Sequence, residues 1–311
     1  MTPVLGGLLA TFGAFCYALS SVAIAKSSQS AQGRGNDVFL SILLTASVAG
    51  VLWVAIGPPL PDYESAVLYG VGYFAAAGLL ANVIGRLTLF RSVELSGAIE
   101  TGLIRRLIPV FAAVFAFLLL GEVITPLIVI AFFLVTAGVL IMMVRPLQKS
   151  RALAETVQRP HADRTRGRAL AVISAGGYGG SFVARKLAMI TLPDPLLGVF
   201  IGALTGLLWF GTSSVAMPRS RIRVRLPLQR PSGWQFLAAS AMTVGQISQF
   251  FALRLANVTS VAIISSVEMF FAAWLAAHIF KTERAPGARF YVAALIAAIG
   301  VVLLAVAPVL E

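Results

Sequence analysis

Residues 97–122 of the chain read GAIETGLIRRLIPVFAAVFAFLLLGE. This stretch is apolar over most of its length, and it exceeds the roughly 20 residues that an α-helix needs to cross a bilayer. Arg105 and Arg106 lie near its middle, and Pro109 follows Arg105 by about one helical turn. A charge at the centre of a spanning helix is costly and usually faces a protein interior or a wet cavity. The stretch therefore predicts a membrane-spanning helix with a polar, kinked centre.

The rest of the chain has the same apolar character. Of its 311 residues, 59% are apolar and 12% are charged, and the mean hydropathy is +0.91. Soluble domains are nearer half apolar and a quarter charged, so this composition excludes an ordinary water-soluble enzyme and a disordered chain. Apolar runs separated by proline-containing breaks predict an all-α integral membrane protein with ten transmembrane helices. The expected spans cover residues 4–26, 37–57, 66–90, 97–120, 125–144, 168–190, 196–216, 233–254, 259–280 and 287–308.

The positions of the basic residues explain the formal net charge of +12. Of the 24 lysines and arginines, 18 fall in the odd-numbered loops or at the adjoining ends of the expected spans, and cytoplasmic loops of membrane proteins retain such residues. We therefore expect an inner-membrane protein with cytoplasmic odd-numbered loops and both termini outside. Basic residues spread over separate loops on one side of a bilayer argue against a nucleic-acid partner. The run from Arg219 to Arg225 leaves open a contact with anionic lipid.

The two halves of the chain correspond to each other at a constant shift along the sequence, which we call the repeat offset. It places Tyr17 on Tyr178 and Glu122 on Glu283. The repeat offset predicts a first five-helix repeat over residues 1–145, a basic cytoplasmic linker over residues 146–167, and a second five-helix repeat over residues 168–311. Because five is an odd number, the second repeat enters the membrane from the opposite side, which gives a 5+5 inverted repeat. Many secondary transporters are built this way, with the substrate site where the repeats meet.

The fourth span and its exit carry the most specific family resemblance. A proline within the span, in Ile108–Ala113, is followed by Gly-Glu at its end, in Leu118–Glu122. Together with ten spans in a 5+5 inverted repeat, this pattern resembles the drug/metabolite transporter (DMT) superfamily, in its EamA-type exporter branch. The second half departs from the pattern at Phe270, where proline would be expected, and at Thr282, where glycine would be. The resemblance implies metabolite export through a central cavity between the repeats, of amino acids, other metabolites or drugs, but it does not specify the substrate.

The charges inside the expected spans are the strongest candidates for substrate contact. Arg105 shares a helical stripe with Pro109, whose ring leaves the Arg105 carbonyl without its usual amide partner. Glu268 lies midway along the ninth span, at the repeat position of Leu107, so a pair with Arg105 or Arg106 is expected where the repeats meet. One interpretation is a substrate-binding or protonatable pair, with Glu268 and Pro109 taking part in gating or coupling. The other is a permanent buried ion pair that fixes helix packing.

Polar residues on matching helical faces extend the candidate site. The substrate-binding candidates beyond the charges are Tyr17, Ser20, Asn82, Tyr178, Ser181, Gln246 and Gln249. Spacings of three and four residues keep the tyrosines and serines on one face of the first and sixth spans. Each of these residues also has a structural interpretation, in helix packing or in hydrogen bonds between helices. Glu100, near the start of the fourth span, is a candidate for gating and equally for a favourable charge at a helix N-terminus.

These features favour a secondary transporter of small metabolites. The spans hold two arginines and one carboxylate at their centre, and this excess of positive charge indicates a carboxylate-bearing substrate. Export of an amino acid or organic anion by alternating access is therefore the leading hypothesis. The alternative is an intramembrane enzyme acting on a lipid-linked substrate, for which Glu122 and Asp194 are the only hints. The sequence holds one cysteine, Cys16, and no catalytic motif, so we expect no catalytic residue, metal or cofactor. Gly202 and Gly206 leave open a homodimer contact.

Overall fold

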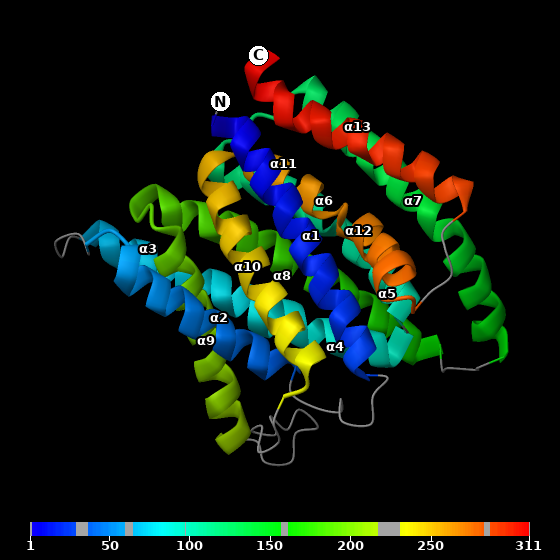
Figure 1. Ribbon diagram of the computed structural model, residues 1–311, viewed down its shortest axis with the longest axis horizontal. Helices are drawn as coiled ribbons and strands as arrows, with labels where there is room; N and C mark the ends of the chain where they lie inside the picture. Colours follow the sequence, from blue (N-terminus) through cyan, green and yellow to red (C-terminus); the bar gives the residue numbers. More distant parts are fainter. Residues whose placement is uncertain are drawn as a thin grey trace.

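The computed structural model describes residues 2–28, 37–59, 65–96, 98–156, 161–216, 231–282 and 287–310. Within these residues the regular secondary structure is helical, which agrees with the expected all-α architecture (Figure 1). The basic run from Arg219 to Arg225 lies outside the described residues, and so does Glu283, the repeat counterpart of Glu122. A lipid contact at the basic run therefore stays a prediction.

The helices of the first half are α1 (Thr2–Ser28), α2 (Asp37–Ile56), α3 (Ser65–Gly78), α4 (Arg86–Ser96), α5 (Ala98–Ile104), α6 (Ile108–Leu120) and α7 (Pro126–Thr156). The π-helical segment η1 (Leu79–Gly85) joins α3 to α4, and the 3-10 segment η2 (Arg105–Leu107) joins α5 to α6. The helices of the second half are α8 (His161–Thr191), α9 (Pro195–Ala216), α10 (Gly233–Leu255), α11 (Val258–Ser265), α12 (Glu268–Trp274) and α13 (Ala288–Leu310), and the π-helical segment η3 (Leu275–Ile279) follows α12. Each expected span falls on one helix or on consecutive helical segments. The expected linker is largely helical, because α7 and α8 both extend into it.

Eight of the helical segments are long and apolar enough to cross a membrane. They are Pro3–Ser27, Phe39–Ile56, Val67–Ser96, Glu100–Leu120, Pro195–Thr212, Gly233–Leu255, Val258–Ile279 and Ala288–Ala307. The apolar part of α7, Pro126–Met142, is shorter, and α8 carries charged residues along with its apolar ones. Large apolar side chains such as Val54, Leu118 and Leu295 are exposed on the surface of the bundle, as expected where a protein faces lipid.

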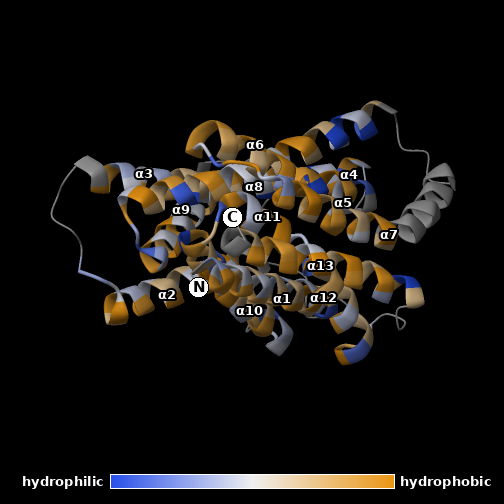
Figure 2. Ribbon diagram, turned by 90° about the horizontal axis from the view of Figure 1, so that it is seen from above, coloured by the Kyte–Doolittle hydropathy of each residue, from blue (hydrophilic) through white to orange (hydrophobic). Residues whose placement is uncertain are grey.

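The helices form two packed groups, which Figure 2 shows as two layers. One group contains α1, α2 and α10, and the other contains α8, α9 and the continuous α3–α4 segment. Contacts between α2 and α9 join the groups, and α7 pairs with α13. The start of α1 and the end of α13 lie at the same end of the bundle, which we call the terminal end (Figure 1). The opposite end, where α7 leaves the bundle and α8 enters it, is called the linker end.

The fourth expected span is broken at its centre. Between α5 and α6 the backbone forms a 3-10 turn, in which the Ile108 amide donates to the Arg105 carbonyl. The expectation of an unpaired Arg105 carbonyl is therefore wrong, because the turn supplies the amide that Pro109 lacks. The ninth expected span breaks in the same way at Ser266 and Val267, between α11 and α12. The repeat offset places Arg105 and the residue after it on these two positions.

The two broken spans also end alike. Gly121 adopts a left-handed φ of 65° after α6, and Lys281 adopts a φ of 50° after η3. In each case the amide of the next residue donates to a carbonyl six residues earlier in the chain. The left-handed position of the second half is therefore Lys281 and not Thr282, where the family pattern would place glycine.

Glycines bring helices close together in the middle of the bundle. A Cβ added at Gly78 of α3 would lie 2.6 Å from the carbonyl oxygen of Gly202 in α9. One turn further along α9, a Cβ at Gly206 would lie 3.1 Å from the Asn82 side-chain amide nitrogen. The Gly202–Gly206 face is therefore packed within the chain and is not free for the homodimer contact that the sequence left open.

Replacing Gly78 with alanine is expected to destabilise the protein, because the added methyl group has to push the α9 backbone away. Overpacking of this kind costs about 1–3 kcal/mol. Gly72→Ala in the same helix is the matched control, since nothing lies within 4 Å of a Cβ added there. Cys16 is 5% exposed and is the only cysteine in the chain, so its reaction with a fluorogenic thiol reagent reports unfolding in detergent. Equal unfolding temperatures for the two variants would contradict the close contact.

Candidate functional site

The breaks in the two spans bring the expected charges together. Glu268 is the first residue of α12, directly after the break at Ser266. Arg106, in the other break, donates from Nη1 to the Ser266 carbonyl at 3.5 Å, which is a long hydrogen bond. Glu268 interacts electrostatically with Arg105 and Arg106, but within the described part of the chain no ion pair of 4.0 Å or less joins it to either. The charges therefore lie near one another without the close contact of a permanent ion pair.

The guanidinium groups of these two arginines are only partly satisfied. Arg105 lies over the ring of Tyr178 in α8, with 5.1 Å between the guanidinium carbon and the ring centroid. The Nε atoms of Arg105 and Arg106 are buried and have no hydrogen-bond partner. Buried donors without a partner are rare in folded proteins, and a ligand that completes their bonding is one explanation.

A third arginine, on α8, shares the neighbour Tyr178 with Arg105. Arg185 is 8% exposed, and its Nη1 donates to Oε1 of Gln249 at 2.7 Å. The same oxygen accepts from the Tyr17 hydroxyl at 3.1 Å, and Nε2 of Gln249 donates to the Ser265 hydroxyl at 3.3 Å. Gln249 thereby links α1, α8, α10 and α11 at this point of the bundle.

Seven side chains form what we call the central cluster: Tyr17, Arg105, Arg106, Tyr178, Arg185, Gln249 and Glu268. Hydrogen bonds join the tyrosine of α1 to the glutamine of α10, and that glutamine to the arginine of α8. This arginine interacts electrostatically with the tyrosine of α8, and the guanidinium of Arg105 lies over the ring of that tyrosine. Glu268 interacts electrostatically with Arg105 and with the tyrosine of α1. The neighbours form a closed ring, and Arg106 lies beside it. Three arginines and one glutamate give the cluster a net charge of +2.

Four of the expected site residues lie outside the central cluster. Ser20 and Asn82 donate to backbone carbonyls of α10 and α9, at 2.8 and 3.1 Å respectively. Ser181 donates to a carbonyl of its own helix at 2.7 Å. These bonds fit the structural interpretation of the three residues. Gln246 is half-buried on α10, and its side chain takes part in none of the hydrogen bonds found among the described residues.

The two remaining gating candidates occupy different places along the fourth span. Glu100 lies in the first turn of α5 at the linker end, where its carboxylate pairs with Arg168 at 2.5 Å and with Arg164 at 3.6 Å. Pro109 is buried in the first turn of α6, directly after the 3-10 break. Glu100 therefore ties α5 to α8, and Pro109 marks the break. A role in gating stays a prediction for both.

Two residues of the site were not expected from the sequence. Ser21 donates to Oε1 of Glu268 at 3.1 Å, whereas its neighbour Ser20 points to α10. Arg185 is not among the candidates named from the sequence, yet it lies inside the bundle. A signal for it exists in the sequence, because the repeat offset places it on Ile24, so a charge stands where the other half is apolar.

Polar contacts close the terminal end of the bundle, one set between the two halves and one within the second half. After α6, Glu122 accepts from the Val258 amide at 2.7 Å, from the Thr259 amide at 3.2 Å and from the Thr259 hydroxyl at 2.9 Å. A carboxylate at this position caps the N-terminus of α11. Lys186 of α8 donates to two carbonyls at the end of α10, at 2.7 and 3.0 Å.

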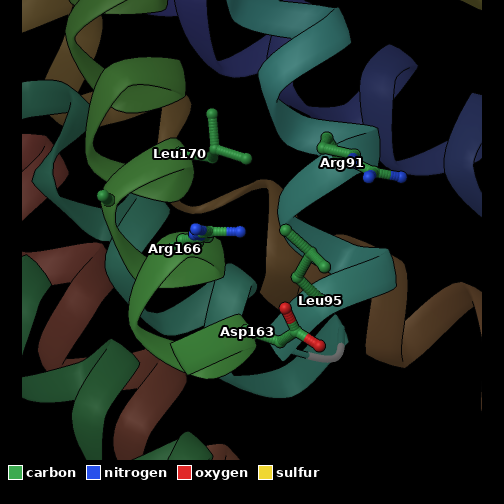
Figure 3. A pocket seen from close by; sticks show the side chains of 6 residues that line it. Arg91, Leu95, Asp163, Arg166 and Leu170 are labelled. Carbon is green, nitrogen blue, oxygen red and sulfur yellow. The ribbon is translucent and has the colours of Figure 1, made fainter. Parts of the chain in front are cut away.

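A surface hollow of about 380 Å³ lies apart from the central cluster, between α4 and the start of α8. Figure 3 shows Arg91 and Leu95 on one side of it, and Asp163, Arg166 and Leu170 on the other. Arg91 is already paired with Glu94 at 2.8 Å. The hollow thus has mixed charge and contains none of the expected site residues.

Residues 4–144, from α1 into α7, match the model of the EamA-like transporter family. This part of the chain is therefore similar to EamA-like transporters. EamA-like transporters are part of the drug/metabolite transporter superfamily, so the match confirms the resemblance seen in the fourth span. Together with the long apolar helices, it supports an integral membrane protein that resembles a small-molecule transporter family.

The architecture of this chain also occurs among solved structures. One of them, described as "Crystal structure of protein", superposes with a TM-score of 0.66 at 17% sequence identity, over 95% of this chain and 96% of that one. At this identity the similarity shows a shared fold and nothing about the substrate. A search of curated proteins gave no match.

Proposed function

We propose that this protein exports a small carboxylate-bearing metabolite, an amino acid or an organic anion, by alternating access. In this proposal ten spans form a 5+5 inverted repeat, the linker end lies in the cytoplasm, and the substrate binds at the central cluster. One observation carries the proposal. Where the broken spans of the two halves meet, Arg105 and Arg106 have buried, unpartnered Nε atoms near Glu268. Arg185 of α8 has the same kind of unpartnered Nε, and it shares the neighbour Tyr178 with Arg105.

The helix contacts support the inverted repeat, because they occur in pairs related by the repeat offset. Helix α1 packs on α10, and its counterpart α8 packs on α3 and α4. Helix α2 packs on α10, and its counterpart α9 packs on α3. The pairs α2–α9 and α7–α13 each join a helix to its own counterpart. Such pairing is what a pseudo-twofold axis between two homologous halves produces.

The lengths of α7 and α8 support ten spans. Each helix has 31 residues, which corresponds to about 46 Å, against about 30 Å for the hydrocarbon core of a bilayer. The charges of α8 lie in its first turns and at Arg185 and Lys186, whose side chains bond to Gln249 and to carbonyls of α10. These charges therefore lower the hydropathy of α8 without facing lipid.

A difference between the two ends of the bundle supports alternating access. At the terminal end, residues 258–264 of α11 are at most 6% exposed, and α11 contacts α1, α6, α8 and α13. At the linker end, the counterpart α5 is partly exposed at Glu100 and at residues 102–104. Among the described residues α5 has no comparable contact with α1, α12 or α13, and Figure 2 shows α5 and α12 in different layers. A bundle packed at one end and separated at the other fits one of the two states that alternating access requires.

The structure favours no catalytic role for the two carboxylates behind the enzyme alternative. Glu122 caps α11, as described above. Asp194 is 5% exposed, and it accepts hydrogen bonds from the Leu197 amide at 3.1 Å and from the Trp53 indole at 2.8 Å. The bond from Leu197 caps the N-terminus of α9. A structural role thus accounts for both residues.

A ligand screen on the purified protein tests the proposed substrate class. Amino acids, organic acids, nucleotides and cationic drugs are added at equal concentration, and the unfolding temperature is followed through the reactivity of Cys16. A ligand that binds only the folded state raises this temperature. At 100 times its Kd it adds about 2.7 kcal/mol to the free energy of unfolding. We expect carboxylates to stabilise the protein and cationic drugs not to. Stabilisation by cationic drugs alone would contradict the proposal.

A further inference from the structure

Arg185 is a charged residue without a charged partner. Its guanidinium bonds through Nη1 to the neutral side chain of Gln249, and its Nε has no hydrogen-bond partner. Its guanidinium carbon lies 4.7 Å from the ring centroid of Phe250 and 5.7 Å from that of Phe182. Across the described ranges, no carboxylate lies within 4.0 Å of it. A cation so placed has an unsatisfied donor and, among the described residues, no carboxylate at ion-pair distance.

The fold does not need a cation at this position. In the proposed repeat the counterpart of Arg185 is Ile24 of α1, where an apolar side chain occupies the equivalent place in the other half. Removing a guanidinium from water is costly unless its charge is compensated, and replacing such a buried charge with an apolar residue is often neutral or stabilising. A charge that packing does not require, inside a membrane domain, points to a role in function.

Tyr178 separates Arg185 from the other two arginines. It precedes Arg185 by seven residues on α8, which puts both side chains on one helical face about 10 Å apart along the axis. Arg105 lies over the ring of Tyr178, and Arg185 interacts electrostatically with the same tyrosine. The central cluster thus has two cationic points on one face of α8. The arginines of the fourth span make one of them, and Arg185 makes the other, closer to the packed terminal end.

We propose that the central cluster binds a small molecule with two separated carboxylates, one at Arg105 and Arg106 and the other at Arg185. This inference rests on the proposed function and specifies its substrate. Glu268 offsets one of the three positive charges, so two remain, and a dicarboxylate neutralises both whereas a monocarboxylate leaves one. Gln249, held by Tyr17, orients Arg185 toward the ligand. A substrate entering from the linker end reaches Arg185 last.

Binding of glutarate and butyrate to the full-length protein in detergent tests this inference by isothermal titration calorimetry. Glutarate is butyrate with one more carboxylate at the far end. We expect the wild type to bind glutarate at least about tenfold more tightly than butyrate, since the second carboxylate forms a charge-assisted bond. In Arg185→Gln the preference is expected to fall below about threefold, with butyrate affinity unchanged, and Arg185→Lys is expected to keep part of the preference. Arg254→Gln is the matched control, because Arg254 is exposed on α10.

Three results would overturn the inference. The first is equal affinity of the wild type for glutarate and butyrate, or no binding of either. The second is an equal loss of affinity for glutarate and butyrate in Arg185→Gln, which would mean that Arg185 only supports the fold. The third is binding of glycerol phosphate, whose two charges lie on one group, as tightly as glutarate and with the same sensitivity to Arg185→Gln.

Uptake into liposomes separates this inference from the proposed function. Selective binding of glutarate without any transport would leave the two-carboxylate site in place and contradict the transporter. Transport of monocarboxylates at the same rate as glutarate would support the transporter and contradict the second site.

Discussion

Replacing Arg106 with alanine is expected to weaken substrate binding by about 30-fold or more. Removing one partner of a buried, hydrogen-bonded charge interaction costs about 2–5 kcal/mol, and about 1.4 kcal/mol corresponds to a factor of ten. Arg106 has a buried, unpartnered Nε and only a long bond to the Ser266 carbonyl, so a ligand carboxylate would be its main partner. The measurement is the dissociation constant of the best ligand from the screen, in detergent.

Two further variants show whether the charges act on the substrate or on the fold. Arg105→Ala is expected to weaken binding to a similar extent, whereas Arg91→Ala breaks only an exposed ion pair with Glu94 and should leave affinity and stability nearly unchanged. In Glu268→Gln the cluster gains one net positive charge, so the affinity for an anion should hold or rise while transport is lost. Unchanged binding in both arginine variants, in protein that is shown to be folded, would leave the cluster with a purely structural role.

Loss of the Glu122 carboxylate is expected to shift the protein toward a state that is open at the terminal end. The carboxylate accepts three hydrogen bonds at the N-terminus of α11, across the contact between α6 and α11. Removing such a charged cap costs about 2 kcal/mol, which changes the ratio of two conformational states by about 30-fold. Among the described residues, α5 and α12 make no comparable contact at the linker end, so the variant Glu122→Ala can gain one there when the terminal end opens.

A matched pair of cysteines reports this shift. Gly102 and Ile263 are equivalent at the repeat offset, yet a Cβ added at Gly102 has nothing within 4 Å, whereas Ile263 is 2% exposed. With Cys16 replaced by alanine, Gly102→Cys is expected to react with a hydrophilic maleimide at least about tenfold faster than Ile263→Cys. Adding Glu122→Ala should speed labelling at position 263 and slow it at position 102. Parallel changes at both positions would indicate loosening of the whole bundle and contradict a two-state exchange.

Glu122→Gln is the control for the capping charge. It keeps an oxygen that accepts hydrogen bonds but loses the favourable interaction of a carboxylate with a helix N-terminus. Its labelling pattern is expected to fall between those of the wild type and Glu122→Ala. Asp194→Asn removes the charge of another capping carboxylate at the terminal end, on α9, and should leave the labelling ratio nearly unchanged.

The spans could be predicted from the sequence because bilayer thickness imposes a length on apolar runs. The fourth expected span at 97–120 corresponds to Ala98–Leu120, and the eighth at 233–254 corresponds to Gly233–Leu255. The central charges could be predicted for a related reason, since Arg105, Arg106 and Glu268 are exceptions within otherwise apolar runs. Composition along the chain is enough for both results, and neither requires knowledge of how the helices pack.

The rest of the site depends on packing that spacing alone does not specify. Ser20 and Ser21 are adjacent, and only the contact of α1 with α10 decides that Ser20 binds a backbone carbonyl while Ser21 reaches Glu268. Asn82 lies in a π-helical segment, which turns its side chain toward α9 in a way that a regular 3.6-residue period does not predict. Arg185 does not stand out in the sequence, because charges are normally found near the end of a span. Its burial follows from the enclosure of α8 by its neighbours.

Transport by the purified protein in liposomes tests the central claim most directly. Vesicles that contain either the wild type or Arg106→Ala are loaded with the best-binding unlabelled carboxylate, and entry of the same compound in labelled form is followed over time. A transporter with its substrate site at the central cluster predicts rapid counterflow into wild-type vesicles, and entry into Arg106→Ala vesicles no faster than into protein-free ones. Equal entry into wild-type and protein-free vesicles, or equal rates for the wild type and Arg106→Ala, would contradict it.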